Sequence, residues 1–107
     1  MEAIYHPSTE ALQLSTVLAA LSDPLRLALV RRLAGEGTGL ACSCLGSPAQ
    51  KTKLSYHLRI LREAGVTSTR AEGTSRLVSL RREDLDARFP GLLDLVLNAQ
   101  PEPVEAL

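Results

Sequence analysis

The chain is short of aromatic residues, which limits the kind of core that it can build. Its 107 residues include one Phe, two Tyr and no Trp, although 45% of the residues are hydrophobic. These hydrophobic residues are mainly Leu, Val and Ala, and such a composition favours packed helices over an aromatic-rich β-sandwich. The length predicts a single domain over residues 1–107, large enough for its own core and small enough to gain burial from a dimer interface.

Long hydrophobic runs are also missing. No stretch approaches the ~18 apolar residues of a membrane-spanning helix, and the first residues lack the basic and apolar segments of a secretory signal. A cytoplasmic protein without a membrane partner is therefore expected.

Cysteine is scarce as well, since the sequence has only Cys42 and Cys44. In a reducing compartment such a pair is expected as free thiols, sensors or ligands rather than as a structural disulfide.

The whole chain has no excess of either charge, because 12 Lys and Arg residues balance 12 Asp and Glu residues. Residues 50–82, however, contain eight basic and two acidic residues, a local balance of +6. The remaining residues contain four basic and ten acidic ones. A surface polarised in this way favours a polyanionic partner.

Two predicted helices, one near each end of the chain, are apolar on more than one side. The first begins at Ser8 or Thr9, either of which can cap it, and runs to about Leu21. The last spans residues 91–99 and follows a short helix over residues 82–88. One apolar face of each helix serves the core, and the excess predicts contact with a partner chain.

A second helix is predicted over residues 25–34. Asp23 can accept hydrogen bonds from its first amides, and Pro24 is tolerated in the first turn because its missing donor has no helical acceptor there. The glycine-rich residues 35–39 end this helix. Residues 40–47, which include both cysteines, leave room for only one or two helical turns.

A longer helix is predicted over residues 50–64. Residues 47–50 match a capping box with proline at the first helical position, and Gly65 provides the C-terminal cap. At about 100° per residue, His57 falls on the apolar face. It is therefore expected to be a buried, hydrogen-bonded core residue rather than a nucleic-acid contact or metal ligand. The opposite face carries Thr52, Ser55, Tyr56, Arg59 and Glu63.

A β-hairpin is predicted after this helix. Residues 66–70 and 75–80 are rich in Val, Thr and Ser, and Gly73 between them can take the positive φ of a tight turn. Arg70 and Arg76 lie on the two arms. The resulting order of elements, mainly α with a small β-hairpin, is that of a winged helix-turn-helix.

Two motifs in these elements resemble the ArsR/SmtB family of dimeric bacterial repressors. Ser-Asp-Pro-x-Arg opens the second helix, and Ser-x-His-Leu-x-x-Leu-x-x-Ala-Gly lies in the 50–64 helix, followed by a glycine-turned hairpin. Either motif alone is weakly specific, but together they extend the resemblance over about residues 10–98. It implies a homodimeric winged helix-turn-helix repressor that binds an inverted-repeat operator in double-stranded DNA. The first and last helices would form the dimer interface.

The polar face of the 50–64 helix suits a DNA major groove, which admits one helix and is read by amide, hydroxyl and guanidinium groups. Flanking cations suit phosphates, and arginines on a thin hairpin suit the minor groove. A basic helix face can also be only a solvated surface, and the Tyr56 ring can simply pack on neighbouring side chains. The predicted base-reading residues are Gln50, Thr52, Ser55, Tyr56 and Arg59. The predicted phosphate and minor-groove contacts are Lys51, Lys53, Arg62, Arg70 and Arg76.

Cys42 and Cys44 form a second candidate site. The resemblance implies an inducer, because in some members of the family a Cys-x-Cys pair in the corresponding region binds arsenite or other thiophilic ions. This chain has no third cysteine, so coordination by three sulfurs is impossible within one protomer. Two-thiolate binding of a soft metal or metalloid ion, an intersubunit site, oxidation sensing and a purely structural thiol pair all stay open.

Catalytic groups are hard to assemble from this sequence. A cysteine would need a histidine beside it, yet His57 is expected in the core and His6 in a mobile N-terminus. The chain is therefore not expected to be an enzyme. The alternative to a DNA-binding repressor is a winged-helix protein-interaction module, and the salt dependence of DNA binding separates these two functions.

Overall fold

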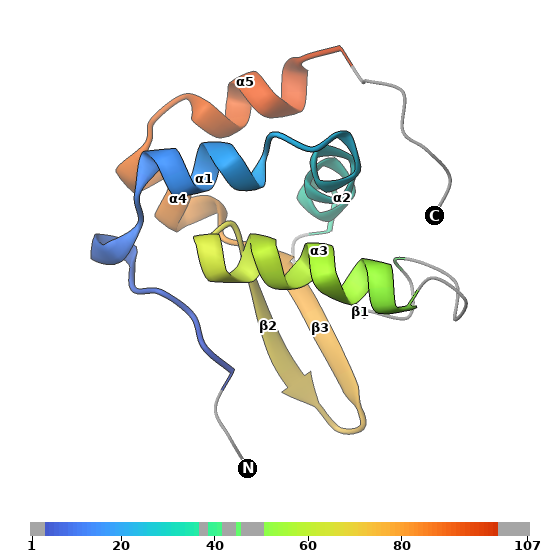
Figure 1. The fold of residues 1–107 in the computed structure, drawn as a ribbon. Helices are drawn as coiled ribbons and strands as arrows, with labels where there is room; N and C mark the ends of the chain where they lie inside the picture. Colours follow the sequence, from blue (N-terminus) through green and yellow to red (C-terminus); the bar gives the residue numbers. More distant parts are fainter. Residues whose placement is uncertain (1–3, 37–38, 42–44, 46–50, 101–107) are drawn as a thin grey trace.

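The computed structural model describes residues 4–36, 39–41, 45 and 51–100. Within them, short helices pack together and a β-hairpin extends away from the helices (Figure 1). In chain order the elements are η1 (Thr9–Ala11), α1 (Leu14–Ala20), α2 (Pro24–Ala34), β1 (Leu40–Ala41), α3 (Lys51–Ala64), β2 (Thr67–Glu72), β3 (Ser75–Leu80), α4 (Arg82–Arg88) and α5 (Leu92–Asn98). This mainly helical architecture with a small antiparallel sheet confirms the predicted fold class. No helix in the described ranges is long and apolar enough to cross a membrane.

The N-terminal helix is shorter than predicted. The expected helix beginning at Ser8 or Thr9 is replaced by a single 3-10 turn, and α1 begins only at Leu14. Ser8 makes no side-chain cap hydrogen bond, and the Thr9 hydroxyl instead donates to Asp84 at 2.7 Å. Leu12 is extended and 1% exposed. Tertiary contacts that place Thr9 and Leu12 against the rest of the fold therefore interrupt the helix.

The start of α2 is as predicted. Asp23 precedes the helix and accepts hydrogen bonds from the backbone amides of Leu25 at 2.8 Å and Arg26 at 3.2 Å, with Pro24 in the first turn. Burial opposes the charged carboxylate, but these hydrogen bonds outweigh it and lower the pKa of Asp23. The ionised cap stabilises the turn that joins α1 to α2.

A third strand forms where the sequence predicts only a helical turn. β1 pairs antiparallel with β3, with Leu40 opposite Val78, so the sheet order is β1-β3-β2. Gly39 precedes β1 with a φ of +100°, and a Cβ at this position would lie 2.9 Å from the Val78 carbonyl oxygen. Glycine therefore allows the chain to approach β3 closely. Apart from Leu45, the rest of the predicted segment after β1 lies outside the described residues.

β2 and β3 form the predicted hairpin, here called the wing. Thr67 pairs with Leu80 at its base and Glu72 with Ser75 at its tip, and Gly73 takes a φ of +61° in the turn. The base is packed against the helices, whereas residues 70–76 are exposed. The tip of the wing is therefore available to a partner.

The hydrophobic core joins the two ends of the chain around α3. Its most buried leucines come from the segment before α1 and from α2, α3, α4 and α5. Each buried leucine side chain contributes about 1.5–3 kcal/mol relative to an exposed one. The leucines that are 1% exposed or less are Leu12, Leu33, Leu61, Leu85 and Leu93.

Candidate nucleic-acid interface

Helix α3 has the two faces that its sequence predicts. Its apolar side packs into the core, with Leu54 5% and Leu61 0% exposed. Its end is fixed by Gly65, which has a φ of +88° and at which a Cβ would overlap the Leu12 side chain. The side facing solvent carries Thr52, Lys53, Ser55, Tyr56 and Arg59. One side of α3 is thus anchored and the other is open, as a groove-binding helix requires.

The exposed cations of α3 and the wing differ in whether they already have an ion-pair partner within the protein. Lys53, Arg59 and Arg76 make no hydrogen bond or ion pair with any other described side chain. Arg70 pairs with Glu72 at 3.2 Å, but the two side chains are 58% and 61% exposed. Such a surface pair contributes only about 0–1 kcal/mol, so it opposes a phosphate contact weakly.

Arg62 lies apart from this exposed set. Its side chain is half-buried, and its Nε is buried without a hydrogen-bond partner among the described residues. Its charge is close enough to His6 to contribute to lowering the pKa of that residue. Arg62 therefore presents less of its charge to solvent than Lys53 or Arg59.

Two of the predicted DNA contacts, Gln50 and Lys51, have side chains outside the described part of the structure. Gln50 lies outside the described residues, and Lys51 begins α3 but its side chain is not among those described. Cys42 and Cys44 also lie outside the described residues. In the part of the chain that is described, no three His, Cys, Asp or Glu side chains lie close enough together to hold a metal ion.

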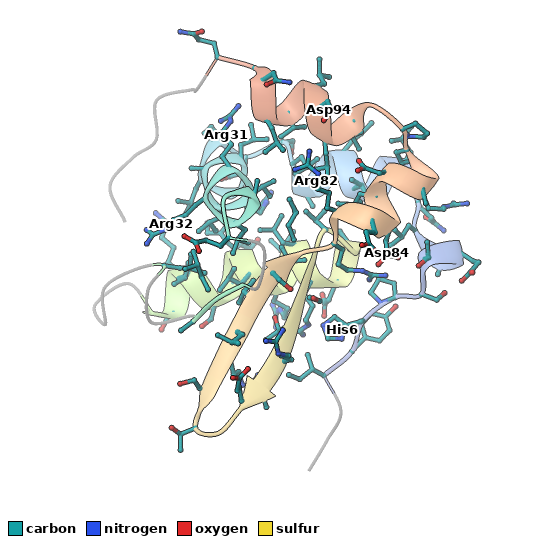
Figure 2. All side chains as sticks on the ribbon, turned by 180° about the vertical axis from the view of Figure 1, so that it is seen from behind. His6, Arg31, Arg32, Arg82, Asp84 and Asp94 are labelled. Carbon is teal, nitrogen blue, oxygen red and sulfur yellow. The ribbon has the colours of Figure 1, made fainter. Side chains whose placement is uncertain are left out.

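The last two arginines of the basic segment both pair with acidic residues, Arg81 in a mostly buried position and Arg82 at the surface. Arg81 is 11% exposed, and it donates to Asp84 at 2.9 Å and to the Pro7 carbonyl at 2.7 Å. Arg82 lies 3.9 Å from Asp86 and 3.4 Å from Asp94. Figure 2 shows Arg82 at the start of α4 with Asp94 above it on α5.

The burial and pairing of Arg81 reduce the positive charge that residues 50–82 offer to a partner. Without the mostly buried Arg81 the segment has seven basic and two acidic residues, a balance of +5, and the surface pairs of Arg82 oppose a partner only weakly. The acidic partners lie just beyond residue 82, which is why a count over the segment misses them. The sequence does contain the spacings that favour ion pairs along a helix, i, i+3 for Arg81–Asp84 and i, i+4 for Arg82–Asp86.

His57 confirms the prediction of a buried, hydrogen-bonded residue on α3. It is 7% exposed, and its Nδ1 lies 3.0 Å from a terminal guanidinium nitrogen of Arg26. Because arginine can only donate, Nδ1 accepts and the ring is neutral, with its proton on Nε2. Burial lowers the pKa of His57, and the charges of Arg26 and Lys53 lower it further against the opposing effect of Asp23.

Arg26 itself was missed as a site residue. Besides its contact with His57, its Nε donates to the Ala20 carbonyl at 2.6 Å. The sequence feature that could have pointed to Arg26 is its place in the Ser-Asp-Pro-x-Arg motif, because the helix cap explains only the other residues of that motif. Sequence alone does not show that this arginine reaches α3.

His6 does not lie in a mobile N-terminus as expected. Its Nε2 accepts a hydrogen bond from the Thr69 backbone amide at 3.0 Å, which places it beside the outer strand of the wing (Figure 2). Burial lowers the pKa of His6; a hydrogen bond with Ile4 opposes this effect, and the charges of Arg62 and Arg81 add to it. The neutral ring therefore holds the N-terminal segment against β2.

A separate apolar surface lies away from the wing. Leu14 and Leu18 of α1 are each 47% exposed, and Leu95 of α5 is 70% exposed. Both helices lie on the side of the molecule opposite the wing tip (Figures 1 and 2). Exposed leucines on these two helices are the excess apolar residues that the sequence predicts there.

Comparison with known proteins gives two relatives, although no family model matches the chain. The uncharacterized HTH-type transcriptional regulator YceK of Bacillus subtilis (strain 168) is 41% identical over 80 residues, which cover 73% of this chain and 80% of that protein. The uncharacterized HTH-type transcriptional regulator MJ1325 of Methanocaldococcus jannaschii is 34% identical over 59 residues, 54% of this chain and 66% of that protein. Both are described as transcriptional regulators, not as enzymes.

Proposed function

The chain belongs to the HTH-type transcriptional regulators, and we propose that it is a repressor of the ArsR/SmtB kind that binds an inverted-repeat operator as a homodimer. Membership in the HTH-type regulators implies double-stranded DNA as the partner. The observation that carries the proposal is the division of α3 into a buried apolar side and an exposed polar side. Occupation of the operator would exclude the polymerase from the promoter.

The exposed side of α3 provides the chemistry for reading bases. Its hydroxyls and the Arg59 guanidinium match the donors and acceptors of base edges in the major groove. Lys53 and the other flanking cations would hold phosphates and set the register, while the wing arginines approach the minor groove. We assign base reading to Gln50, Thr52, Ser55, Tyr56 and Arg59. We assign backbone and minor-groove contacts to Lys51, Lys53, Arg62, Arg70 and Arg76.

The exposed leucines of α1 and α5 support the homodimer. Leu14, Leu18 and Leu95 expose apolar area to water, and burying a fully exposed leucine contributes about 1.5–3 kcal/mol. Because these side chains are 47%, 47% and 70% exposed, each contributes a corresponding fraction of that value on burial. A two-fold dimer presents two copies of α3 about one DNA turn (~34–36 Å) apart, which requires an inverted repeat. Leu18→Glu should therefore produce monomers in sedimentation, and the monomer should lose operator binding.

Cys42 and Cys44 remain the proposed site of an inducer. Two thiolates suit a soft metal or metalloid ion, and oxidation could also modify them. An inducer would favour a dimer geometry in which the two α3 helices no longer match adjacent grooves. Titrating the operator complex with arsenite, methylarsenite, mercury, zinc and peroxide tests this, with Cys42→Ser and Cys44→Ser as comparisons. Release that survives both substitutions would remove the cysteines from the mechanism.

Salt dependence of DNA binding tests the main proposal. The purified chain should first select duplexes from a random library at low salt. A dimer that makes about 6–10 phosphate contacts should then lose about 10³–10⁵ in affinity between 50 and 200 mM salt. Failure to retain any duplex at low salt would favour the alternative, a winged-helix protein-interaction module.

A further inference from the structure

The Arg26 side chain lies where three helices meet. Its Nε donates to the carbonyl of Ala20, the last residue of α1, at 2.6 Å. Its terminal guanidinium nitrogen lies 3.0 Å from Nδ1 of His57, in the middle of α3. Its backbone belongs to the first turn of α2 and is held there by Asp23. A single side chain from α2 therefore connects α1 to α3.

The geometry of the guanidinium makes this connection rigid. Its donors lie in one plane in a fixed fork, so satisfying both acceptors fixes the Ala20 carbonyl relative to the His57 ring. The Ala20 carbonyl is at the C-terminal end of α1, where carbonyl groups lack helical partners and a cation is favourable. Both contacts are part-buried, which strengthens them relative to contacts in bulk water.

The two helices that Arg26 connects carry different surfaces. α1 carries the exposed Leu14 and Leu18, and α3 carries the exposed polar side. In the proposed dimer, the relation between these helices sets how far apart and at what angle the two copies of α3 lie. An error of one base pair rotates a half-site by about 34–36° at 10–10.5 base pairs per turn. The distance and angle between α1 and α3 must therefore be fixed within narrow limits.

We propose that Arg26 is a positioning residue that fixes α3 relative to α1 and so sets the half-site spacing that the dimer accepts, without contacting DNA. The inference rests on the proposed function. It adds a residue and a role that the base and phosphate contacts do not include.

His57 completes the connection because it must accept a hydrogen bond. Protonation of Nδ1 would remove the acceptor and place a second cation against Arg26. The charged groups that face His57 are Asp23 before α2, Arg26 on α2 and Lys53 on α3. The Tyr56 ring meets the His57 ring edge to face at 5.2 Å between centroids, so the connection reaches a residue proposed to read bases.

The test compares operators that differ only in the spacing of their half-sites. The selected operator is lengthened or shortened by one base pair, and a single half-site is measured alongside. The wild type should prefer the selected spacing by about tenfold or more, as it would for other single-position errors. Arg26→Lys keeps the charge but not the fork, and it should reduce this preference to about twofold while half-site affinity changes less than threefold. Arg32→Lys, an exposed arginine on the same helix, should keep the wild-type preference.

Different failures have different meanings in this experiment. An Arg26→Lys dimer that is folded by circular dichroism and keeps the spacing preference would overturn the inference, as would equal losses on half-site and full operator. If wild type selects no duplex, the proposed function itself fails.

A second set of measurements covers the case in which Arg26 variants do not fold. The spacing preference of the wild type should decline as pH falls into the range where the folded His57 gains a proton, which its lowered pKa places below the ordinary value of about 6.5. His57→Asn, whose side-chain oxygen can still accept, should make the preference independent of pH. His6→Asn serves as the matched control and should leave the pH dependence in place. A wild-type preference that stays constant while the His57 ring protonates, followed by the NMR signals of that ring, would contradict the role of the Arg26–His57 contact.

Discussion

The exposed cations of α3 and Arg81, at the start of α4, belong to one basic stretch of sequence but have different surroundings. Lys53 and Arg59 are exposed and make no ion pair with another described residue. Arg81 is 11% exposed and bound to Asp84 and the Pro7 carbonyl. The difference shows that the charge counted along a sequence segment does not determine the charge exposed at the surface. The exposed charge also depends on where the acidic partners lie in the fold.

This comparison predicts different consequences when each group is removed. Loss of a bound arginine should reduce stability, since it leaves polar groups without partners. Loss of an exposed cation should reduce DNA affinity and leave stability nearly unchanged.

The largest effect is expected from Arg81→Met. The change removes charged hydrogen bonds to Asp84 and to the Pro7 carbonyl, and we expect a loss of about 1.5–3 kcal/mol in the free energy of unfolding, measured in urea. The matched Arg76→Met, at the exposed wing, should stay within about ±0.5 kcal/mol. Similar losses for both variants would contradict the division between bound and exposed arginines.

Arg59→Ala should weaken binding to the selected operator by about 1–3 kcal/mol if the guanidinium reads a base. Its stability should stay close to that of the wild type, because the side chain is exposed. Gel-shift or fluorescence titrations on operator and random duplexes measure the effect. An equal loss on both duplexes would show a phosphate contact instead.

Lys53→Ala should weaken operator and random duplex binding by similar factors. A phosphate contact releases a counterion, so the slope of log affinity against log salt should fall by about 1. Titrations at several salt concentrations give this slope. An unchanged slope would remove Lys53 from the DNA interface.

Acidification should reduce stability through the two histidines. Burial lowers the pKa of both His6 and His57, so the unfolded chain binds protons more readily than the folded one. Their contribution is present above the ordinary histidine pKa of about 6.5 and is lost as pH falls through and below it. Urea unfolding at pH 7.5 and 5.5 should show the decline. His6→Asn and His57→Asn should each flatten it, and an unchanged decline in the double variant would assign it to other groups.

The smallest effect is expected from Glu72→Gln. The exposed pair with Arg70 contributes only about 0–1 kcal/mol to stability, so the free energy of unfolding should change little. DNA affinity should rise slightly, because Arg70 loses a competing carboxylate and the wing loses a negative charge. Reduced affinity would contradict the proposed position of the wing.

Local features of the fold could be predicted from sequence. The Asp23 cap depends on its immediate neighbours, and the glycines after α3 and in the wing turn occupy the left-handed backbone that their positions require. The burial of His57 follows from helical periodicity in the same way. Each of these predictions uses residues within one helix or one turn.

Features that depend on distant partners could not be predicted. Thr9 does not cap a helix as expected, because its hydroxyl donates a hydrogen bond to Asp84, 75 residues away. β1 exists because β3 pairs with it, and Arg26 reaches His57 across 31 residues. The proposed base-reading face was therefore accessible from sequence, whereas the contacts that hold it in place were not.

The specificity ratio tests the central claim most directly. It is the affinity of the full chain for its selected operator divided by its affinity for random duplex at the same salt concentration. Reading of bases by the exposed side of α3 predicts a ratio of about 10³ or more, reduced by Arg59→Ala. A ratio near one, unchanged by Arg59→Ala, would contradict the account.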